Sequence, residues 1–399
     1  MNRLLSVRTL NHAVLKSFQL KLMEVIMMNK MPLLFAFIVF NANANTPAPT
    51  NLDDFKSCSA DSCSIDVVSK YNTHPSVFGG DMVYSEPVYS TVNKLGDNLL
   101  FQPKGVVSVY NPVSGMALKK DTDYTVDGKL ITINPSRFVQ VAPENFTDPL
   151  IPDPRINFRL KEDYNQYQYP VTYEKNESLP LYISGDVNNL RKMISESDDL
   201  KVTFFGDSIT FIDEYINKPS DFTQPPYAYL VNAYMAVMKG DGYKWYNPSV
   251  NGWNTNNAVS VINERFLKHD SDLYILAFGM NDAVDVTPET YLANIETLIN
   301  AVKAKRPDAY ILIESSTLPN PEWTLPHHDY FKNYENGISN LTSKYDKVVF
   351  LDLTSTWRDI FSRKNYWSMT MNGINHPNDF GHRVIAEALL TTLLGSSFK

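Results

Sequence analysis

The sequence predicts an α/β protein in two parts: a parallel five-stranded sheet with helices on both faces, preceded by an all-β sandwich or jelly-roll domain. From about residue 196 onward, short apolar runs alternate with segments at helical spacing, the pattern of a covered parallel sheet. Residues 66–190 instead hold short β-type runs, Pro and turn residues, with no clear helix before Asn188. The 399 residues exceed one average domain and suit two.

The composition is that of a folded, mildly acidic protein. Hydrophobic residues make up 43% and charged residues 20%, which excludes wholesale disorder. The formal net charge is −8 and no long basic run occurs, so a dedicated nucleic-acid-binding protein is not expected.

Residues 1–44 have the form of a secretory signal peptide, with the stretch before Met27 as an over-extended start. Lys30 supplies the positive charge, residues 31–40 the apolar run, and the small residues up to Ala44 a cleavage site. Spanning a bilayer takes roughly 20 residues, so no stable membrane span is predicted; the alternative is a buried core segment. Cleavage near Ala44 predicts a secreted or periplasmic protein.

Cys58 and Cys63 are the only cysteines, and both lie in the predicted linker, residues 45–65. In an exported protein such a pair predicts a small structural disulfide loop. Redox catalysis usually shows two intervening residues, whereas four separate this pair. A metal site would need further ligands, and the nearest histidine is His74. The chain as a whole predicts no metal and no cofactor.

The elements of the front domain are short. Residues 123–133 are a predicted hairpin whose type I′ turn lies at Asp127-Gly128, because both central positions of that turn need positive φ. Four tyrosines are candidates for a platform that stacks on sugar rings, although the favoured interpretation is ordinary packing inside the domain. They are Tyr164, Tyr167, Tyr169 and Tyr173. Further strands are predicted at residues 106–110 and 182–183.

The second domain, residues 196–399, shows its elements more clearly. Thr287 and Pro288 cap and open a helix, and Gly240 ends the helix at 226–239. The expected buried faces are Leu230, Val231, Tyr234 and Met238 on the earlier helix, and Tyr291, Ile295, Leu298 and Val302 on the later one. The predicted strands are 202–205, 245–249, 273–278, 311–313 and 348–351, and the last helix is 379–394.

Unusual polar residues stand at three strand ends and before the last helix. In open α/β sheets, sites form outside the carboxyl ends of the strands. Ser208 leaves a strand just after Gly206, which favours exposure of its hydroxyl group. The remaining motifs are Val250-Asn251-Gly252-Trp253-Asn254, Gly279-Met280-Asn281-Asp282 and Asn375-His376-Pro377-Asn378.

These four blocks together resemble the SGNH hydrolases, also called GDSL esterases, over the half of the chain from Asn188 to the end. The resemblance implies a three-layer, flavodoxin-like α/β/α fold. It implies that Ser208 is the nucleophile and His376 the general base and then acid. The Ser208 N–H, the Gly252 N–H and the Asn281 amide would form the oxyanion hole.

The chemistry agrees with these roles. Serine is a weak nucleophile until a base takes its proton, and histidine has a pKa near neutrality that lets it accept and return one. The developing oxyanion needs fixed donors. The motif is not the G-x-S-x-G elbow of the α/β-hydrolases, because Thr210 stands at the second glycine position.

One departure concerns the residue that orients the histidine. The family usually places an Asp three residues before it, where this chain has Gly373. Asn372 and Asp379 are the candidate orienters, and Asp379 is expected to cap the last helix instead. The sequence therefore predicts a Ser208–His376 dyad, with a backbone carbonyl or Asn372 as the group that orients the imidazole.

Other polar residues receive structural interpretations. Asp282 is expected to be structural, and His327-His328-Asp329 an exposed loop rather than a metal site. Trp253 and Trp367 are candidate substrate-lining residues.

A secreted β-domain before an SGNH domain resembles the two-domain carbohydrate acetylesterases. That resemblance predicts a serine esterase acting on O-acetyl groups of a polysaccharide, through an acyl-enzyme on Ser208, with an acetylated glycan or a small ester as substrate. The alternatives are a general short-chain esterase or acyltransferase, and a non-enzymatic glycan-binding protein. The oligomeric state is not predicted.

Overall fold

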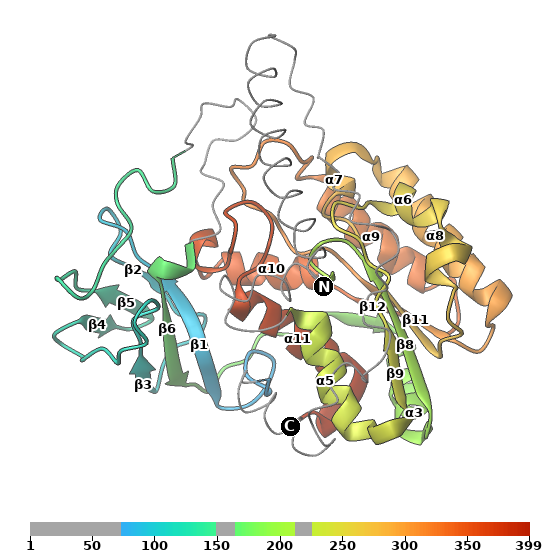
Figure 1. Ribbon diagram of the computed structural model, residues 1–399, viewed down its shortest axis with the longest axis horizontal. Coiled ribbons are helices and arrows are strands. Elements are labelled where there is room, and N and C mark those ends of the chain that lie inside the picture. Colours follow the sequence, from blue (N-terminus) through green and yellow to red (C-terminus); the bar gives the residue numbers. More distant parts are fainter. Residues whose placement is uncertain (1–72, 149–163, 212–225) are drawn as a thin grey trace, which may run out of the picture. The chain divides into compact units, whose positions relative to one another are not determined.

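The computed structural model describes residues 73–148, 164–211 and 226–399 (Figure 1). All of them belong to one compact unit, residues 48–399. The predicted signal peptide and Cys58 and Cys63 lie outside the described residues, so the cleavage site, the disulfide and the domain boundaries stay predictions. Among the described helices, none combines the length and the apolar composition that crossing a membrane requires.

A six-stranded sheet forms the centre of the C-terminal half (Figure 1). Its strand order is β7-β12-β11-β10-β8-β9; β9, β8, β10, β11 and β12 run parallel, which confirms the five predicted parallel strands. The sixth strand, β7, pairs antiparallel with β12. The bounds are β7 Ile183–Gly185, β8 Leu200–Gly206, β9 Tyr243–Tyr246, β10 Leu273–Ala277, β11 Tyr310–Glu314 and β12 Val348–Leu351.

The edge strand β7 corrects one prediction. Residues 182–183 are predicted to form a strand of the all-β domain, whereas Ser184 pairs with Phe350 of the central sheet. Gly185 has φ +88, and a Cβ there would lie 2.2 Å from the Val348 carbonyl oxygen, so only glycine permits this approach. Three residues are too short a period to assign a strand to one sheet or another from sequence.

Helices cover both faces of this sheet, so the predicted three-layer arrangement is confirmed (Figure 1). On one face α11 packs against α3 and α5, and on the other α8 packs against α6 and α9. The bounds are α3 Val187–Glu196, α5 Tyr227–Lys239, α6 Thr255–Ser260, α7 Asp282–Asp285, α8 Pro288–Lys305, α9 Tyr330–Thr342, α10 Leu353–Phe361 and α11 Asp379–Leu394. Short 3₁₀ helices span Tyr164–Tyr167, Gly240–Gly242, Tyr366–Ser368 and Gly395–Ser397, and Ile262–Phe266 form a π-helix.

The helix faces follow from apolar spacing, with one exception. Thr287 accepts a hydrogen bond from Thr290 N and caps α8, and the four residues predicted to face the core are buried. On α5 the predicted face fails at its last position, because Met238 is 43% exposed and Met235 is buried instead. The end of α5 has turned away from the core by then, and Gly240, at φ +61, terminates it.

The N-terminal part consists of two three-stranded antiparallel sheets, with strand orders β1-β6-β3 and β2-β5-β4. We call these two sheets together the β-part. The predicted hairpin is confirmed, but its turn is Gly128-Lys129 rather than Asp127-Gly128, and of these residues only Gly128 has positive φ. The type I′ prediction is therefore wrong. The bounds are β1 Met82–Tyr89, β2 Gly96–Asn98, β3 Gly105–Val109, β4 Tyr124–Asp127, β5 Leu130–Ile133 and β6 Gln168–Glu174.

The tyrosines of the β-part do not form an exposed platform. Tyr164, Tyr169 and Tyr173 are fully buried, and Tyr167 is half-buried. Their hydroxyl groups serve the interior: Tyr173 donates to Glu86 at 2.6 Å, and Tyr169 donates to the Gln140 carbonyl. Packing, the favoured interpretation, is what the structure shows.

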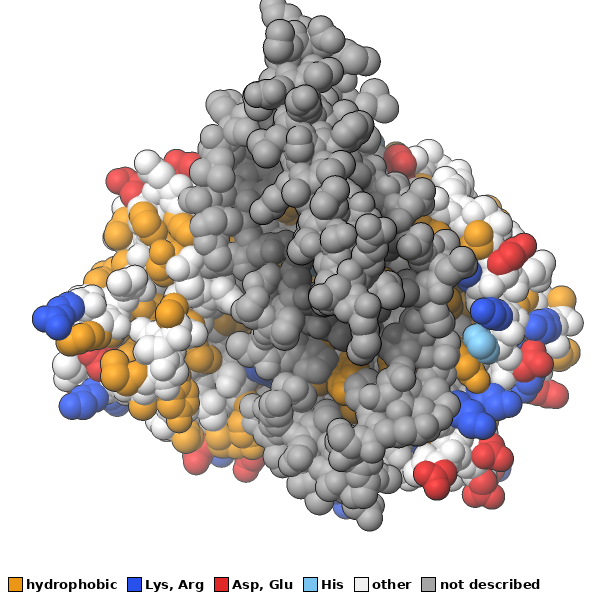
Figure 2. Space-filling model, viewed as in Figure 1, with side chains coloured by type: hydrophobic (Ala, Val, Ile, Leu, Met, Phe, Trp, Pro, Cys, Tyr) orange, Lys and Arg blue, Asp and Glu red, His pale blue; other side chains and the backbone are white. Residues whose placement is uncertain are grey.

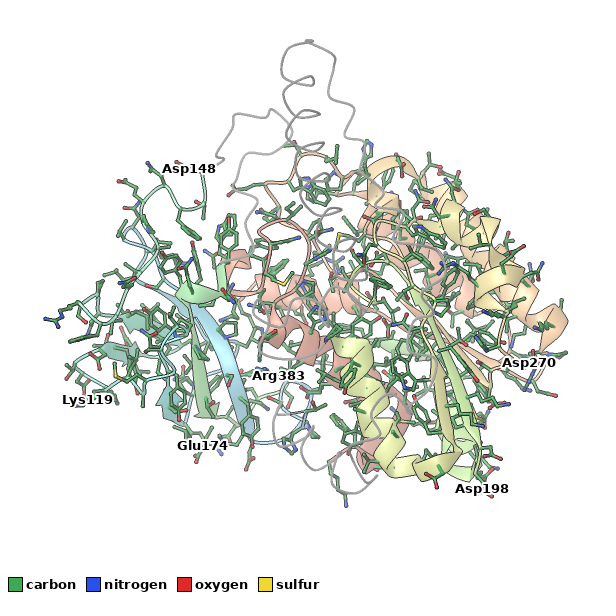
Figure 3. The ribbon with its side chains drawn as sticks, in the orientation of Figure 1. Lys119, Asp148, Glu174, Asp198, Asp270 and Arg383 are labelled. Carbon is green, nitrogen blue, oxygen red and sulfur yellow. The ribbon has the colours of Figure 1, made fainter. Side chains whose placement is uncertain are left out.

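The β-part shares its apolar core with the central sheet, since buried residues of both belong to one contiguous cluster. Hydrogen bonds from α11 also join the two parts. Arg383 of α11 lies beside β1 (Figure 3) and donates to the Tyr84 carbonyl at 2.8 Å. Glu387, one turn further along α11, accepts hydrogen bonds of 2.6–2.8 Å from the backbone N–H groups of residues 76–78.

The surface differs between the two parts. Apolar side chains gather over the β-part in Figure 2, and charged ones over the α/β part. Val113, Phe138 and Val107 are 74%, 62% and 60% exposed.

Candidate active site

Ser208 lies at the carboxyl end of β8, two residues after Gly206, a glycine that the packing requires. A Cβ on Gly206 would come within 2.5 Å of both the Ala277 carbonyl oxygen and Thr210 Oγ1. The turn after the strand is closed by Thr210 N and Phe211 N, which donate to the Asp207 carbonyl at 3.2 and 3.0 Å. This turn leaves the Ser208 side chain half-buried, with its hydroxyl at the edge of the sheet.

His376 meets this serine, as the motifs predict. Its Nε2 atom is 2.9 Å from Ser208 Oγ. The backbone of His376 is held on both sides: its carbonyl accepts from Met371 N at 2.9 Å and its N–H donates to Asn372 Oδ1 at 3.1 Å. The predicted nucleophile and the predicted base are therefore in hydrogen-bond contact.

The electrostatics around His376 favour a neutral imidazole. Desolvation lowers the pKa of His376 to about 4, and no carboxylate raises it. Within the described ranges, no hydrogen bond joins a carboxylate to this ring. A neutral imidazole at physiological pH can accept a proton from the serine hydroxyl.

The two candidate orienters lie next to the histidine without bonding its ring. The Asn372 side chain accepts from the backbone N–H groups of Ile374, Asn375 and His376 at 2.9–3.1 Å, so it shapes the loop. Asp379 is the first residue of α11, but the cap is Asn378, whose Oδ1 accepts from Gly381 N at 3.1 Å. The prediction that Asp379 caps the helix is wrong by one residue, because Asn378 has the extended backbone that a cap needs.

The predicted oxyanion donors lie on neighbouring loops. Gly252 sits in a turn closed by Trp253 N and the Val250 carbonyl at 3.3 Å, and its φ of +74 favours glycine. Val250 N in turn donates to the Gly206 carbonyl at 3.2 Å, which joins this turn to the nucleophile strand. Asn281 Nδ2 donates to the Trp253 carbonyl at 2.9 Å. That bond fixes the Asn281 amide and uses one of its two N–H groups.

Asp282 has the structural role that was expected. It is buried, and its Oδ1 accepts hydrogen bonds from Thr255 N at 2.9 Å and from Thr255 Oγ1 at 2.5 Å. These bonds hold the first residue of α6 in place. Burial raises the pKa of Asp282 to about 6.

The remaining candidate residues, two tryptophans and two histidines, have different surroundings. Trp253 is half-buried, with the Arg265 guanidinium 5.2 Å from its ring centroid. Trp367 stacks on Tyr164 at 5.1 Å, so one face of its indole is covered. His327 and His328 lie on an exposed loop as expected, and the described residues contain no group of three metal-binding side chains.

A buried polar group behind the nucleophile was not predicted. Tyr227 OH donates to Glu314 Oε2 at 2.8 Å and lies 2.9 Å from Thr210 Oγ1, in the turn that carries Ser208. Burial raises the pKa of Glu314 to about 8, so the carboxyl is protonated at neutral pH. These residues and Asp207 line a cavity with room for about one water molecule. A glutamate ending the apolar run at residues 310–314 was the available sequence signal.

Comparisons with known proteins place the site in a matched segment. Residues 204–384 match the model of the GDSL-like Lipase/Acylhydrolase family, and curated proteins give no match. An acetylxylan esterase from Geobacillus stearothermophilus is 19% identical over 49% of this chain and 94% of its own, with a TM-score of 0.41. A GDSL-like lipase from Parabacteroides merdae is 19% identical over 49% and 95%, with a TM-score of 0.41. A two-domain esterase active on acetylated mannans is 18% identical over 55% and 56%, with a TM-score of 0.42.

Proposed function

We propose that this carboxylic ester hydrolase, whose residues 204–384 match the GDSL-like lipase/acylhydrolase family, removes O-acetyl groups from a polysaccharide. The observation that carries the proposal is the 2.9 Å contact between Ser208 Oγ and His376 Nε2 at the carboxyl edge of the sheet. A hydroxyl in contact with a neutral imidazole is the arrangement that acyl transfer to serine needs.

The proposed reaction has two halves. Ser208 Oγ attacks the acetyl carbonyl while His376 Nε2 takes the hydroxyl proton, which gives a tetrahedral oxyanion. Collapse of this intermediate breaks the ester bond, and His376 returns the proton to the departing sugar hydroxyl. Water then attacks the acetyl-serine with His376 as base, and acetate leaves. The Ser208 N–H, the Gly252 N–H and the Asn281 amide are the proposed oxyanion donors.

Aromatic side chains support the sugar part of the proposal. Trp253 follows Gly252 on one flanking loop, and Trp367 precedes His376 on the other; both are half-buried. Indole rings suit the apolar faces of sugar rings. The signal-peptide pattern at residues 27–46 supports export, which would bring the enzyme to extracellular or periplasmic glycans.

Acetate release tests the proposal. The protein is incubated with a panel of acetylated polysaccharides and with aryl acetates, beside a Ser208→Ala variant, which loses only a hydroxyl group. We expect acetate from at least one polysaccharide and none above background from the variant. Faster transfer to an added sugar acceptor than to water would indicate an acyltransferase. Glycan binding without turnover would contradict the proposal and favour a binding protein.

A further inference from the structure

Gln168 of the β-part is hydrogen-bonded to residues on both sides of His376, within the loop that carries this histidine. We call residues 366–378 the histidine loop. Gln168, the first residue of β6, is buried, and its Nε2 donates to the carbonyls of Trp367 and Thr370, each at 2.7 Å. Its Oε1 accepts from Asn378 Nδ2 at 2.8 Å. Because two carbonyl oxygens face the same atom, that atom must be the amide nitrogen.

Two of the residues that bond Gln168, Thr370 and Asn378, also hold the backbone around His376. Thr370 forms an antiparallel bridge with Pro377, and its Oγ1 donates to the His376 carbonyl at 3.3 Å. Asn378 Nδ2 also donates to the Ser368 carbonyl at 2.9 Å, and Asn378 caps α11. Gln168 therefore joins the residues before His376 to those after it.

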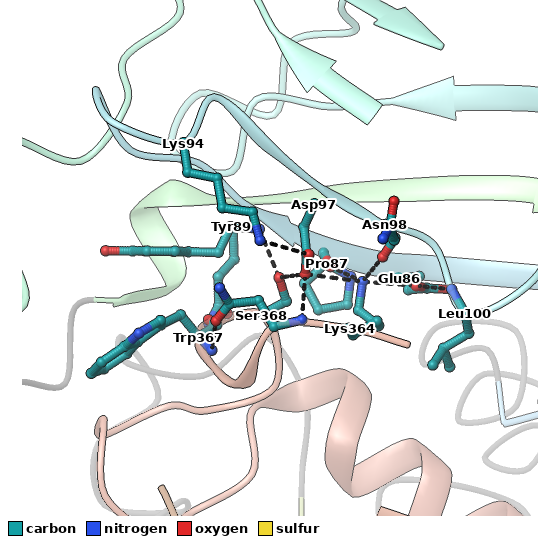
Figure 4. Close-up of polar contacts among 12 residues, drawn as sticks. Glu86, Pro87, Tyr89, Lys94, Asp97, Asn98, Leu100, Lys364, Trp367 and Ser368 are labelled. Atoms are coloured by element: carbon teal, nitrogen blue, oxygen red, sulfur yellow. Dashed lines mark hydrogen bonds and ion pairs between the residues drawn. The ribbon is translucent and has the colours of Figure 1, made fainter. Parts of the chain in front are cut away.

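A second group of contacts holds the start of the same loop (Figure 4). Asp97 Oδ2 accepts from Ser368 Oγ at 2.6 Å and from Asn365 N at 3.0 Å. Ser368 Oγ also accepts from Tyr89 N at 3.0 Å. Lys364, fully buried, contacts Glu86 at 2.8 Å. The β-part thus contacts the start of the loop through Asp97 and Tyr89, and residues on both sides of His376 through Gln168.

In the described residues, the ring of His376 is hydrogen-bonded to Ser208 and to no carboxylate. Its Nε2 contacts Ser208, while Gly373 occupies the position where the family has its orienting acid. Throughout the described residues, no carboxylate bonds the ring, so the imidazole takes its orientation from its backbone. Small displacements of a catalytic group are costly in rate.

We infer that Gln168 is a positioning residue for His376, and that the β-part, through this amide, holds the base against the nucleophile. This inference rests on the proposed function, in which His376 is the base. The β-part then contributes to turnover without touching the substrate.

The test replaces the amide at nearly constant volume. Gln168→Met removes all three hydrogen bonds, and we expect kcat for an aryl acetate to fall on the order of 10²-fold with little change in KM, because the base is displaced rather than the substrate. The matched control is Thr172→Val on the same strand, which removes a bond from Ser85 N within the β-part and should keep wild-type kcat. Gln168→Glu is the conservative variant: a protonated carboxyl regains one donor, so its rate should recover towards wild type as pH falls.

Hydrogen exchange gives a readout besides turnover. The backbone N–H groups of Met371 and His376 are hydrogen-bonded, and they should exchange faster in Gln168→Met than in Thr172→Val at the same temperature. Equal kcat and equal exchange in the two variants would overturn the inference. If Gln168→Met does not fold, the same comparison is made with Gln168→Glu, where a pH-independent wild-type rate has the same meaning. A wild-type protein without esterase activity would contradict the proposed function, whereas the exchange comparison would still test the positioning role.

Discussion

Ser208 and His376 stand 168 positions apart in the chain, and one hydrogen bond joins them. What each residue does depends on its immediate surroundings: a glycine before the serine, a loop around the histidine, and no carboxylate on the ring in the described part of the chain. The imidazole is kept neutral by desolvation, which suits a base. In the described structure it lacks the charge that a third triad member supplies.

Asp379→Asn tests whether this pair works as a dyad. We expect kcat to stay within about threefold of wild type, because Asp379 is the first residue of α11 and does not bond the His376 ring in the described part of the chain. Helix stability should fall by roughly 0.3–1 kcal/mol, since a carboxylate at a helix N-terminus is lost. Kinetics on an aryl acetate and thermal melts are measured together. A rate loss approaching 10⁴, the value for an Asp-to-Asn change in a triad, in a normally melting protein would identify Asp379 as the third member.

Asn281→Ala tests the oxyanion hole. The amide is fixed by its bond to the Trp253 carbonyl, so its second N–H is available to a developing charge. Removing one such donor lowers kcat by about 10² to 10³, and we expect a smaller change in KM. Steady-state kinetics on an aryl acetate measure both constants for the variant and the wild type. A change confined to KM would show that Asn281 positions the substrate instead.

At the scale of single elements, buried polar groups connect strand ends to their neighbours. Glu314 ends β11 and bonds Tyr227 at the start of α5, which contacts Thr210 after β8. Lys364 and Glu86, both fully buried, connect the segment after α10 to β1. The protonation of Glu314 and the ion pair between Lys364 and Glu86 both affect the free energy of unfolding.

Glu314→Gln should flatten the pH dependence of stability. In the folded state burial raises the pKa of Glu314 to about 8, whereas the unfolded chain releases that proton near its ordinary value of 4.5. The group's contribution to stability therefore declines as pH rises through this window. Compared with wild type, the variant should gain on the order of 1 kcal/mol or more between pH 5 and pH 8. Denaturant unfolding at both pH values measures it; parallel pH curves would show that the folded carboxyl is ionised.

Lys364→Met should be strongly destabilising. The variant leaves Glu86 buried without its cation, and breaking a buried pair on one side costs about 3–5 kcal/mol. Lys192→Met is the control, because Lys192 and Glu196 form an exposed pair at 4.0 Å, and such pairs contribute about 0–1 kcal/mol. Urea midpoints compare the two variants. A similar small loss in both would mean that Glu86 finds another partner or takes up a proton.

Sequence reasoning predicted the long elements well because their signals are local. The strand at residues 348–351 and the helix at 379–394 match the structure at both ends, since the apolar pattern lies within each segment and the residues that end the helix flank it directly. It failed where the deciding partner is distant. The strand at residues 183–185 belongs to whichever sheet edge it meets. The cap of α11 was missed for a different reason, because the choice between Asn378 and Asp379 depends on backbone angles that the residue types do not reveal. Gln168 carried no motif, since its three partners lie about 200 residues away.

At the scale of the whole molecule, one apolar core runs through the β-part and the central sheet. Two independent domains would each have their own core and a thin interface between them. Here the histidine loop, α11 and the central sheet all contact or share a core with the β-part, so its removal would expose their buried faces.

The shared core predicts one unfolding transition for residues 48–399. Loss of the β-part exposes the core of the sheet, so we expect calorimetric and van't Hoff enthalpies that agree within about 10%. Differential scanning calorimetry and the fluorescence of the five tryptophans, all of which lie in the C-terminal half, follow the same transition. Two resolved peaks, or fluorescence that melts apart from the heat signal, would contradict it.

The three hydrogen bonds from residues 76–78 to Glu387 span more than 300 positions of the chain. During translation the first strands leave the ribosome long before their partner in α11 is made. Burying that part of the chain must wait for almost the last segment to emerge, which delays native closure until synthesis is nearly complete. The bonds to Glu387 therefore form only after α11 has left the ribosome.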